Sequence, residues 1–264
     1  MSERIKKIFE TTGKKLVTFT TGGDPDLNTS LEILKTIINN GIDIIEIGMP
    51  FSDPMADGPT IQESSVRSLS NGTKINDIFE IVMKIRKFNN EIPIILMGYY
   101  NSIFNLGIDN FTAKCAVTGV DGLIIVDLQP EEDSELLTKT KDKGIDLIRL
   151  ITPTTDQKRL TTILSNASGF LYYVTVTGIT GQNSANIEDL KKSINTIKSS
   201  TKLPIVAGFG IKNKNDVEQI STFTDGVVVG SSIVNIIKDN LNDKNKMINE
   251  IKVFTKDLKE GIKE

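Results

Sequence analysis

Asp43-Ile44-Ile45-Glu46-Ile47-Gly48 is the stretch that decides the fold, because its isoleucines would cover both faces of an extended strand. A strand that is apolar on both faces is typical of a parallel sheet that is buried on both sides. Seven further short runs along the chain are mostly apolar in the same way, and we expect each of them to form a strand: Leu16–Thr20, Ile94–Met97, Gly122–Val126, Leu147–Ile151, Leu171–Thr175, Pro204–Ala207 and Gly226–Val229.

Amphipathic segments lie between these runs. Ile78, Ile81 and Ile85 follow the i, i+3, i+7 spacing of one helix face. Thr29 and Glu32 resemble a capping box, which predicts that another helix begins at Thr29. Helices that alternate with parallel strands indicate the α/β class.

Eight such strands predict a closed barrel, a (β/α)8 TIM barrel with an extra N-terminal helix, in a single domain over residues 1–264. A doubly wound open sheet is the alternative. The gap between the second and third strands, from Asp43 to Ile94, is about twice as long as most others. The excess follows Gly48 at the carboxyl end of a strand, where loops build the active sites of TIM barrels.

The composition excludes several classes of chemistry. The chain has 31 Lys and Arg against 34 Asp and Glu, a near-balance that gives no electrostatic footprint for nucleic acid or an anionic membrane. It contains no histidine, so a Ser-His-Asp triad or a His-ligated metal site cannot form within it. Its one cysteine, Cys115, cannot form an internal disulfide, and we expect it to be a small apolar residue in a helical stretch. Acid–base chemistry would therefore fall to carboxylates, lysine or tyrosine.

The amino-terminal residues carry mixed charge and no apolar core, which is unlike a signal peptide or a transit peptide. No apolar run approaches the roughly 18 residues that suggest a membrane span. We therefore expect a soluble protein of the cytoplasm, or of the plastid stroma if the gene is plastid-encoded.

Glu46 is the first candidate catalytic residue, because a carboxylate in a strand buried on both faces is costly unless it is paired or used. Partial desolvation would raise its pKa toward values that suit proton transfer. The alternative is a structural ion pair with a lysine of the barrel.

The long loop after this strand, Met49 to Thr60, holds three prolines and one glycine, which stiffen it. It carries two acids, Asp53 and Asp57. Either acid could act in catalysis, or both could be solvated carboxylates in turns around Pro54 and Gly58.

Glycines follow the last three expected strands, in Gly178-Ile179-Thr180-Gly181, Gly208-Phe209-Gly210 and Gly230-Ser231. Glycine lets backbone N–H groups approach an anion closely, and the start of a helix favours negative charge. TIM barrels frequently bind phosphate at the loops after strands seven and eight. The pattern predicts a small phosphorylated substrate, although each glycine alone could be a turn residue.

The segment Gly48-Met49-Pro50-Phe51-Ser52-Asp53-Pro54-Met55-Ala56-Asp57-Gly58-Pro59-Thr60-Ile61-Gln62 closely resembles the signature of the tryptophan synthase α subunit family. Further matches keep their order and spacing over nearly the whole chain: Thr21-Gly22-Gly23-Asp24-Pro25, Met97-Gly98-Tyr99-Tyr100-Asn101, Thr177-Gly178-Ile179-Thr180-Gly181 and Gly208-Phe209-Gly210-Ile211. The resemblance implies a lyase that cleaves indole-3-glycerol phosphate into indole and glyceraldehyde 3-phosphate.

The resemblance also implies a role for each matching position. Glu46 matches the family's general acid/base, Asp57 the acid that binds the indole N–H, and Tyr172 a tyrosine near them. Phe19 matches a residue that packs on the indole. The remaining substrate contacts, which include the phosphate site, would come from Thr180, Gly181, Gly210, Gly230 and Ser231.

The same resemblance implies a partner, a pyridoxal-phosphate-dependent β subunit in an α2β2 heterotetramer, which would receive the indole. Asp53 and Pro54 are the candidate contact residues, and the chain itself would hold no metal and no cofactor. Three alternatives remain: a stand-alone indole-glycerol phosphate lyase, a phosphosugar isomerase of the phosphate-binding barrels, and a catalytically dead subunit that only activates a partner.

Overall fold

The computed structural model describes residues 1–174, 184–208 and 210–262. Its strands are β1 (Lys15–Thr21), β2 (Ile44–Gly48), β3 (Ile94–Gly98), β4 (Gly122–Ile125), β5 (Asp146–Leu147), β6 (Arg149–Ile151), β7 (Leu171–Val174), β8 (Ile205–Gly208) and β9 (Gly226–Val229). Its helices are α1 (Glu3–Glu10), α2 (Leu27–Asn39), α3 (Pro59–Ser70), α4 (Ile75–Phe88), α5 (Tyr100–Leu106), α6 (Ile108–Thr118), α7 (Ser134–Asp142), α8 (Gln157–Ser165), α9 (Ser184–Ser200), α10 (Lys214–Ser221), α11 (Ser231–Asp239) and α12 (Lys244–Glu260).

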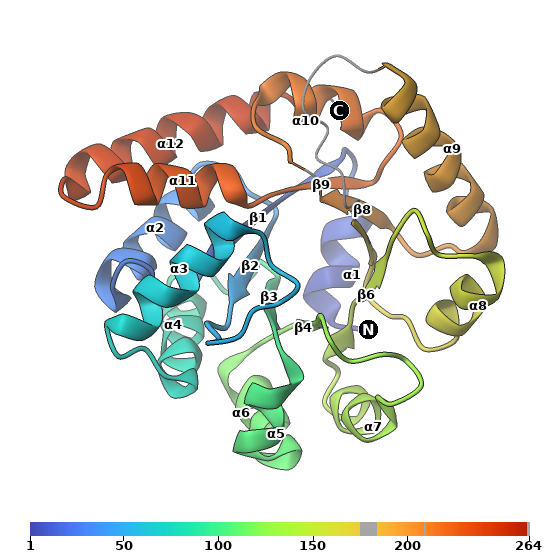
Figure 1. Ribbon diagram of the computed structural model, residues 1–264, viewed down its shortest axis with the longest axis horizontal. Coiled ribbons are helices and arrows are strands. Elements are labelled where there is room, and N and C mark those ends of the chain that lie inside the picture. The colour runs from blue at the N-terminus through green and yellow to red at the C-terminus, as the bar shows by residue number, and fades with distance from the viewer. Residues whose placement is uncertain (175–183, 209, 263–264) are drawn as a thin grey trace.

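The strands form one parallel sheet in the order β5-β4-β3-β2-β1-β9-β8-β7-β6, and helices surround it (Figure 1). The two ends of this order, β5 and β6, are consecutive in the chain and are separated only by Ile148. β5 pairs with β4 and β6 pairs with β7, so the barrel closes through this one stretch. The predicted TIM barrel is confirmed, and the fifth predicted strand is two short segments that pair with different neighbours.

Two separate apolar layers hold the barrel together. The inner layer fills the interior of the barrel with buried side chains from most of the strands, among them Val17, Ile44, Ile95 and Val228. The outer layer lies between the strands and the surrounding helices, and it includes Cys115, which lies in α6 and is fully buried. Strands that are buried on both sides explain the apolar runs of the sequence.

Helix α1 is the predicted extra N-terminal helix, and it closes the amino-terminal end of the barrel. Ile5 packs within the inner layer. Just before the helix, the Ser2 backbone N–H donates to Asp146 Oδ2 at 2.8 Å, and its hydroxyl donates to Asp121 Oδ1 at 2.7 Å. Both acids lie at the amino ends of strands, so α1 leaves only the carboxyl end of the barrel open for a site that reaches its interior.

One prediction about helix ends was wrong. Helix α2 does not begin at Thr29, because Asp26 is its N-cap and accepts hydrogen bonds from the backbone N–H groups of Asn28 and Thr29 at 2.9 and 3.0 Å. Asp26 has the extended backbone that an N-cap needs, whereas Thr29 already lies inside the helix. Among the described residues, no helix combines the length and the apolar character that would be needed to cross a bilayer.

Candidate active site

Glu46 lies in the middle of β2 and points into the barrel. Its register partners are Phe19 on β1 and Ile95 on β3, and Ile44, two residues earlier on the same strand face, belongs to the inner layer. Glu46 is fully buried, and neither carboxylate oxygen has a hydrogen-bond partner among the described residues. The described residues therefore show no structural ion pair between Glu46 and a lysine, which was the alternative to a catalytic role.

Burial without a partner changes the proton affinity of Glu46. Removing the carboxylate from water disfavours its charged form, which raises the pKa of Glu46 to about 8. At neutral pH the side chain is therefore mostly protonated and can give up its proton close to physiological pH. A carboxyl group of this kind is suited to act both as an acid and as a base.

The raised pKa of Glu46 should make stability fall with pH. The unfolded chain loses this proton near pH 4.5, whereas the folded protein keeps it until about pH 8. Between these values the folded state binds more protons, so the free energy of unfolding should decrease by up to about 1.4 kcal/mol per pH unit. We expect urea unfolding between pH 5 and 8 to show this slope in the wild type and to lack it in Glu46→Gln. If the difference in the free energy of unfolding between the two proteins stays constant with pH, the raised pKa of Glu46 is contradicted.

Asp57 lies in the loop that joins β2 to α3, and Tyr99 holds it. The Tyr99 hydroxyl donates to Asp57 Oδ2 at 3.1 Å and accepts a hydrogen bond from the Ala56 backbone N–H at 3.0 Å. The Tyr99 ring stacks on Phe51, with ring centroids 5.1 Å apart. Burial raises the pKa of Asp57, and the hydrogen bond from Tyr99 opposes that rise. The sequence placed Tyr99 in a matching motif but did not reveal this positioning role.

Tyr172 on β7 is close enough to both acids to sense their charges. Burial, followed by the negative charges of Glu46 and Asp57, raises the pKa of Tyr172 well above its usual value, so the phenol stays protonated. A Cβ atom on Gly208 would lie 2.4 Å from the Tyr172 hydroxyl oxygen, so only glycine fits beside this side chain. The three predicted catalytic residues therefore come together from β2, β7 and one loop.

A cavity of about 850 Å³ opens at the carboxyl ends of the strands, and five of the predicted residues line it: Asp57, Tyr172, Gly210, Gly230 and Ser231. Glu46 and Phe19 do not line it, and both are buried. The Phe19 ring fills the space beside Gly48, where an added Cβ would lie 2.6 Å from it. The predicted contacts Thr180 and Gly181 lie outside the described residues.

One end of this cavity has the features of an anion site. Helix α11 begins at Ser231, and its N-cap, Gly230, has no side chain to satisfy the first backbone N–H groups. The Ser232 hydroxyl donates to the Ile211 carbonyl at 3.1 Å, which ties this helix to the loop after β8. Free N–H groups at the start of a helix favour a bound anion.

Lys212 also lines this cavity, and sequence reasoning did not single it out. Its side chain is exposed and forms no ion pair with any described residue. The only signal in the sequence is that it follows Gly210 by two positions, in the loop after β8. It adds a positive charge beside the anion site.

The predicted partner residues lie at the surface of the β2–α3 loop. Asp53 is exposed and accepts a hydrogen bond from the Ser52 hydroxyl at 2.5 Å, and Pro54 is half-buried. Met55, the next residue, is an apolar side chain that is 86% exposed. Within the described part of the chain, no three His, Cys, Asp or Glu side chains gather in a way that could hold a metal ion.

Comparisons with known proteins point to one family, and the match extends over nearly the whole chain. The family model of the tryptophan synthase alpha chain matches residues 5–263. The tryptophan synthase alpha chain of Petrotoga mobilis (strain DSM 10674 / SJ95) is 43% identical over 256 residues, which make up 97% of this chain and 98% of that protein. Among solved structures, tryptophan synthase subunit alpha from Legionella pneumophila str. Paris has a TM-score of 0.91 and 34% identity, with 99% of this chain and 98% of that chain covered.

The aminoacrylate-bound form of tryptophan synthase from M. tuberculosis is also similar, with a TM-score of 0.88 and 26% identity over 98% of this chain and 99% of that chain. The phosphosugar isomerase that the sequence left open does not account for this agreement. The chain therefore belongs to the tryptophan synthase alpha chain family, and it is a lyase that cleaves indole-3-glycerol phosphate in tryptophan biosynthesis.

Proposed function

We propose that Glu46 carries the protons in a retro-aldol cleavage of indole-3-glycerol phosphate. The observation that carries this proposal is a fully buried carboxyl group with no described partner and a pKa of about 8, in a barrel whose open end forms the cavity. A group that is mostly protonated at neutral pH can act first as an acid and then as a base.

The cleavage would proceed in two proton transfers. Protonated Glu46 gives its proton to indole C3, which breaks the aromaticity of the five-membered ring and leaves a positive charge on the ring nitrogen. The Glu46 carboxylate then takes the proton from the hydroxyl group on the adjacent side-chain carbon. As that hydroxyl becomes an aldehyde, the bond between the two carbons breaks and its electron pair restores the indole ring. Glu46 ends protonated, so the steps balance without a metal or a second base.

Asp57 would stabilise the positive charge that develops on the indole nitrogen. A carboxylate held in position before the reaction stabilises such a charge without reorganising, which lowers the barrier. The hydrogen bond from Tyr99 supports this role, because it favours the charged form of Asp57 and fixes one of its oxygens. Tyr172 and Phe19 would pack beside the indole and define its plane.

The phosphate group would bind where Gly210, Gly230 and Ser231 line the cavity, with Thr180 and Gly181 as further contacts. This binding would hold the reacting carbon in place, so that energy from the remote phosphate assists the chemical step. We propose that Lys212 adds a charge contact to the phosphate, since it lines the same cavity and forms no ion pair with a described residue.

Replacing Lys212 by Met should therefore weaken substrate binding more than it slows the chemistry. Loss of a hydrogen bond between charged groups corresponds to about a tenfold rise in KM, with kcat changed much less. Steady-state kinetics of indole release would measure both values. Lys252→Met, an exposed substitution on α12, is the matched control and should leave KM unchanged. A KM for Lys212→Met that equals the wild-type value would exclude this contact.

We further propose that the β2–α3 loop binds a tryptophan synthase β subunit, which holds pyridoxal phosphate and receives the indole in an α2β2 heterotetramer. Exposed Met55 beside Asp53 and Pro54 supports an apolar contact at this loop. The same loop carries Asp57, so a partner that orders the loop would also order the active site. This coupling predicts slow cleavage by the isolated chain.

The test supplies indole-3-glycerol phosphate to the purified chain and follows indole release, alone and with a tryptophan synthase β subunit. We expect slow release alone and a strong increase, at least about tenfold, with the partner, in the range of typical coupling free energies. Equal rates would favour the stand-alone lyase instead. No release under either condition would contradict the roles proposed for Glu46 and Asp57.

A further inference from the structure

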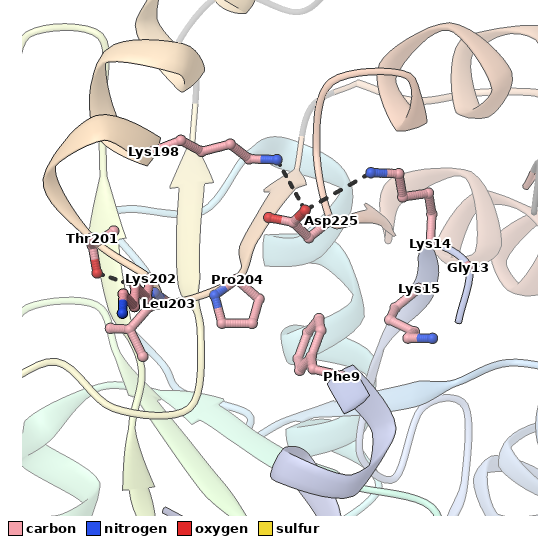
Figure 2. A pocket seen from close by; sticks show the side chains of 10 residues that line it. All are labelled: Phe9, Gly13, Lys14, Lys15, Lys198, Thr201, Lys202, Leu203, Pro204 and Asp225. Carbon is pink, nitrogen blue, oxygen red and sulfur yellow. Dashed lines mark hydrogen bonds and ion pairs between the residues drawn. The ribbon is translucent and has the colours of Figure 1, made fainter. Parts of the chain in front are cut away.

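A second large pocket lies at the opposite end of the barrel from the active-site cavity. Its volume is about 510 Å³, and it is formed by the end of α1, the start of β1 and the segment that joins α9 to β8 (Figure 2). Lys15 begins β1, Pro204 directly precedes β8, and Asp225 directly precedes β9, so the pocket lies at the amino ends of the strands. Small-molecule sites typically enclose roughly 300–1,000 Å³, so this pocket is large enough for a ligand.

Positive charge dominates this pocket. Four lysines line it, Lys14, Lys15, Lys198 and Lys202, together with one acid, Asp225. Lys14 and Lys198 reach Asp225 from opposite sides, and both contact the same oxygen, Oδ1, at 3.8 and 2.9 Å (Figure 2). The other oxygen of Asp225 accepts a backbone N–H at 2.9 Å. One carboxylate can neutralise only one of the two ammonium groups.

The other two lysines are not neutralised by this acid. The ammonium group of Lys15 is turned away from Asp225, donates to oxygens of Thr11 and Thr12 at 2.8 to 3.1 Å, and lies within the electrostatic reach of Asp43. Lys202 is exposed and has no partner among the described residues. Lys14, Lys198 and Lys202 against the one carboxylate of Asp225 leave an excess of two positive charges at this pocket, in a chain whose net charge is −3.

The pocket also offers apolar contacts next to its charges. The Phe9 ring and the Pro204 ring lie on one side of Asp225, and Leu203 lies beside Lys202 (Figure 2). A ligand that matches these walls would carry an anionic group at one end and a flat or apolar part at the other. Phosphate suits the charged end, because a doubly charged group with several acceptor oxygens can bridge lysines that act as point charges.

We propose that this pocket is a binding site for a small phosphate-bearing molecule. The phosphate contacts the exposed ammonium group of Lys202, and the carbon part of the ligand packs on Phe9 and Pro204. The site is separate from the proposed catalytic residues, since it lies at the other end of the barrel, and it does not depend on their roles.

Calorimetric titration of the full chain with phenyl phosphate tests this proposal. We compare the wild type with Lys202→Glu, and with Lys256→Glu on α12 as a control that makes the same change in net charge at an exposed position. Loss of one charged contact should weaken phenyl phosphate binding by at least about tenfold in Lys202→Glu. The control should stay within about twofold of the wild type, and any binding in the active-site cavity should be the same in all three proteins.

Two results would overturn the proposal: no phenyl phosphate binding by the wild type beyond that in the active-site cavity, or equal affinity of the wild type and Lys202→Glu. Lys202 has no described partner, so its replacement should leave the melting temperature without ligand unchanged. If Lys202→Glu nevertheless does not fold, Lys202→Gln removes the charge without adding another and allows the same comparison.

Discussion

Glu46→Gln should lower kcat for indole release by about 10²- to 10⁴-fold, which is the usual contribution of a positioned general acid or base. Glutamine keeps the size of the side chain and its place between Phe19 and Ile95, but it cannot give a proton to indole C3 and take one from the hydroxyl group. The fold should remain intact, because Glu46 has no described hydrogen-bond partner whose loss could destabilise it. The effect should therefore appear in kcat rather than in the amount of folded protein.

The control for this experiment is Glu63→Gln, because Glu63 is an exposed acid on α3 that pairs with Lys238 at 2.6 Å. It should leave kcat unchanged. Glu46→Gln should also still activate a β subunit that is given free indole, because the contact loop is untouched. Normal cleavage by Glu46→Gln would show that another group carries the protons.

The second large effect is expected for Asp57→Asn, with a fall in kcat of about 10²- to 10³-fold, as for the loss of one preorganised electrostatic contact. The amide oxygen can still accept the hydrogen bond from Tyr99, so the loop keeps its position. What is lost is the negative charge beside the indole nitrogen.

Asp53→Asn is the matched control for this substitution, since it changes an exposed acid in the same loop. It should leave kcat of the isolated chain unchanged and weaken only the response to the β subunit. The role of Asp57 would be disproved by a kcat for Asp57→Asn within about twofold of the wild type, because that result would mean that its charge does not act in the transition state.

The barrel could be predicted from the sequence because a strand that is buried on both faces is a run of mostly apolar residues. Runs such as Ile44 to Ile47 are apolar on both sides for that reason, and each of them forms a strand in the structure, the fifth as two short segments. The break at Ile148 could not be predicted, because it depends on which neighbour each half of the strand pairs with. The choice of Asp26 rather than Thr29 as the helix cap depends on backbone angles, which both sequence patterns would allow.

The candidate site was predictable to different extents. Glu46 was evident because a charge within a buried strand is costly and therefore calls for an explanation. The contact of Tyr99 with Asp57 was not evident, since it requires the β2–α3 loop to fold back over the end of β3. Lys212 was not evident either, because a lysine in an exposed loop can point in many directions and its spacing from Gly210 does not show that it lines the cavity.

The most direct test of the proposed mechanism is a crystal structure of Glu46→Gln with uncleaved indole-3-glycerol phosphate bound. We predict that the indole ring lies between residue 46 and Asp57, with its nitrogen on the Asp57 carboxylate and the phosphate against Gly210 and the start of α11. An indole that lies away from both acids, or a phosphate bound at the other end of the barrel, would contradict the account.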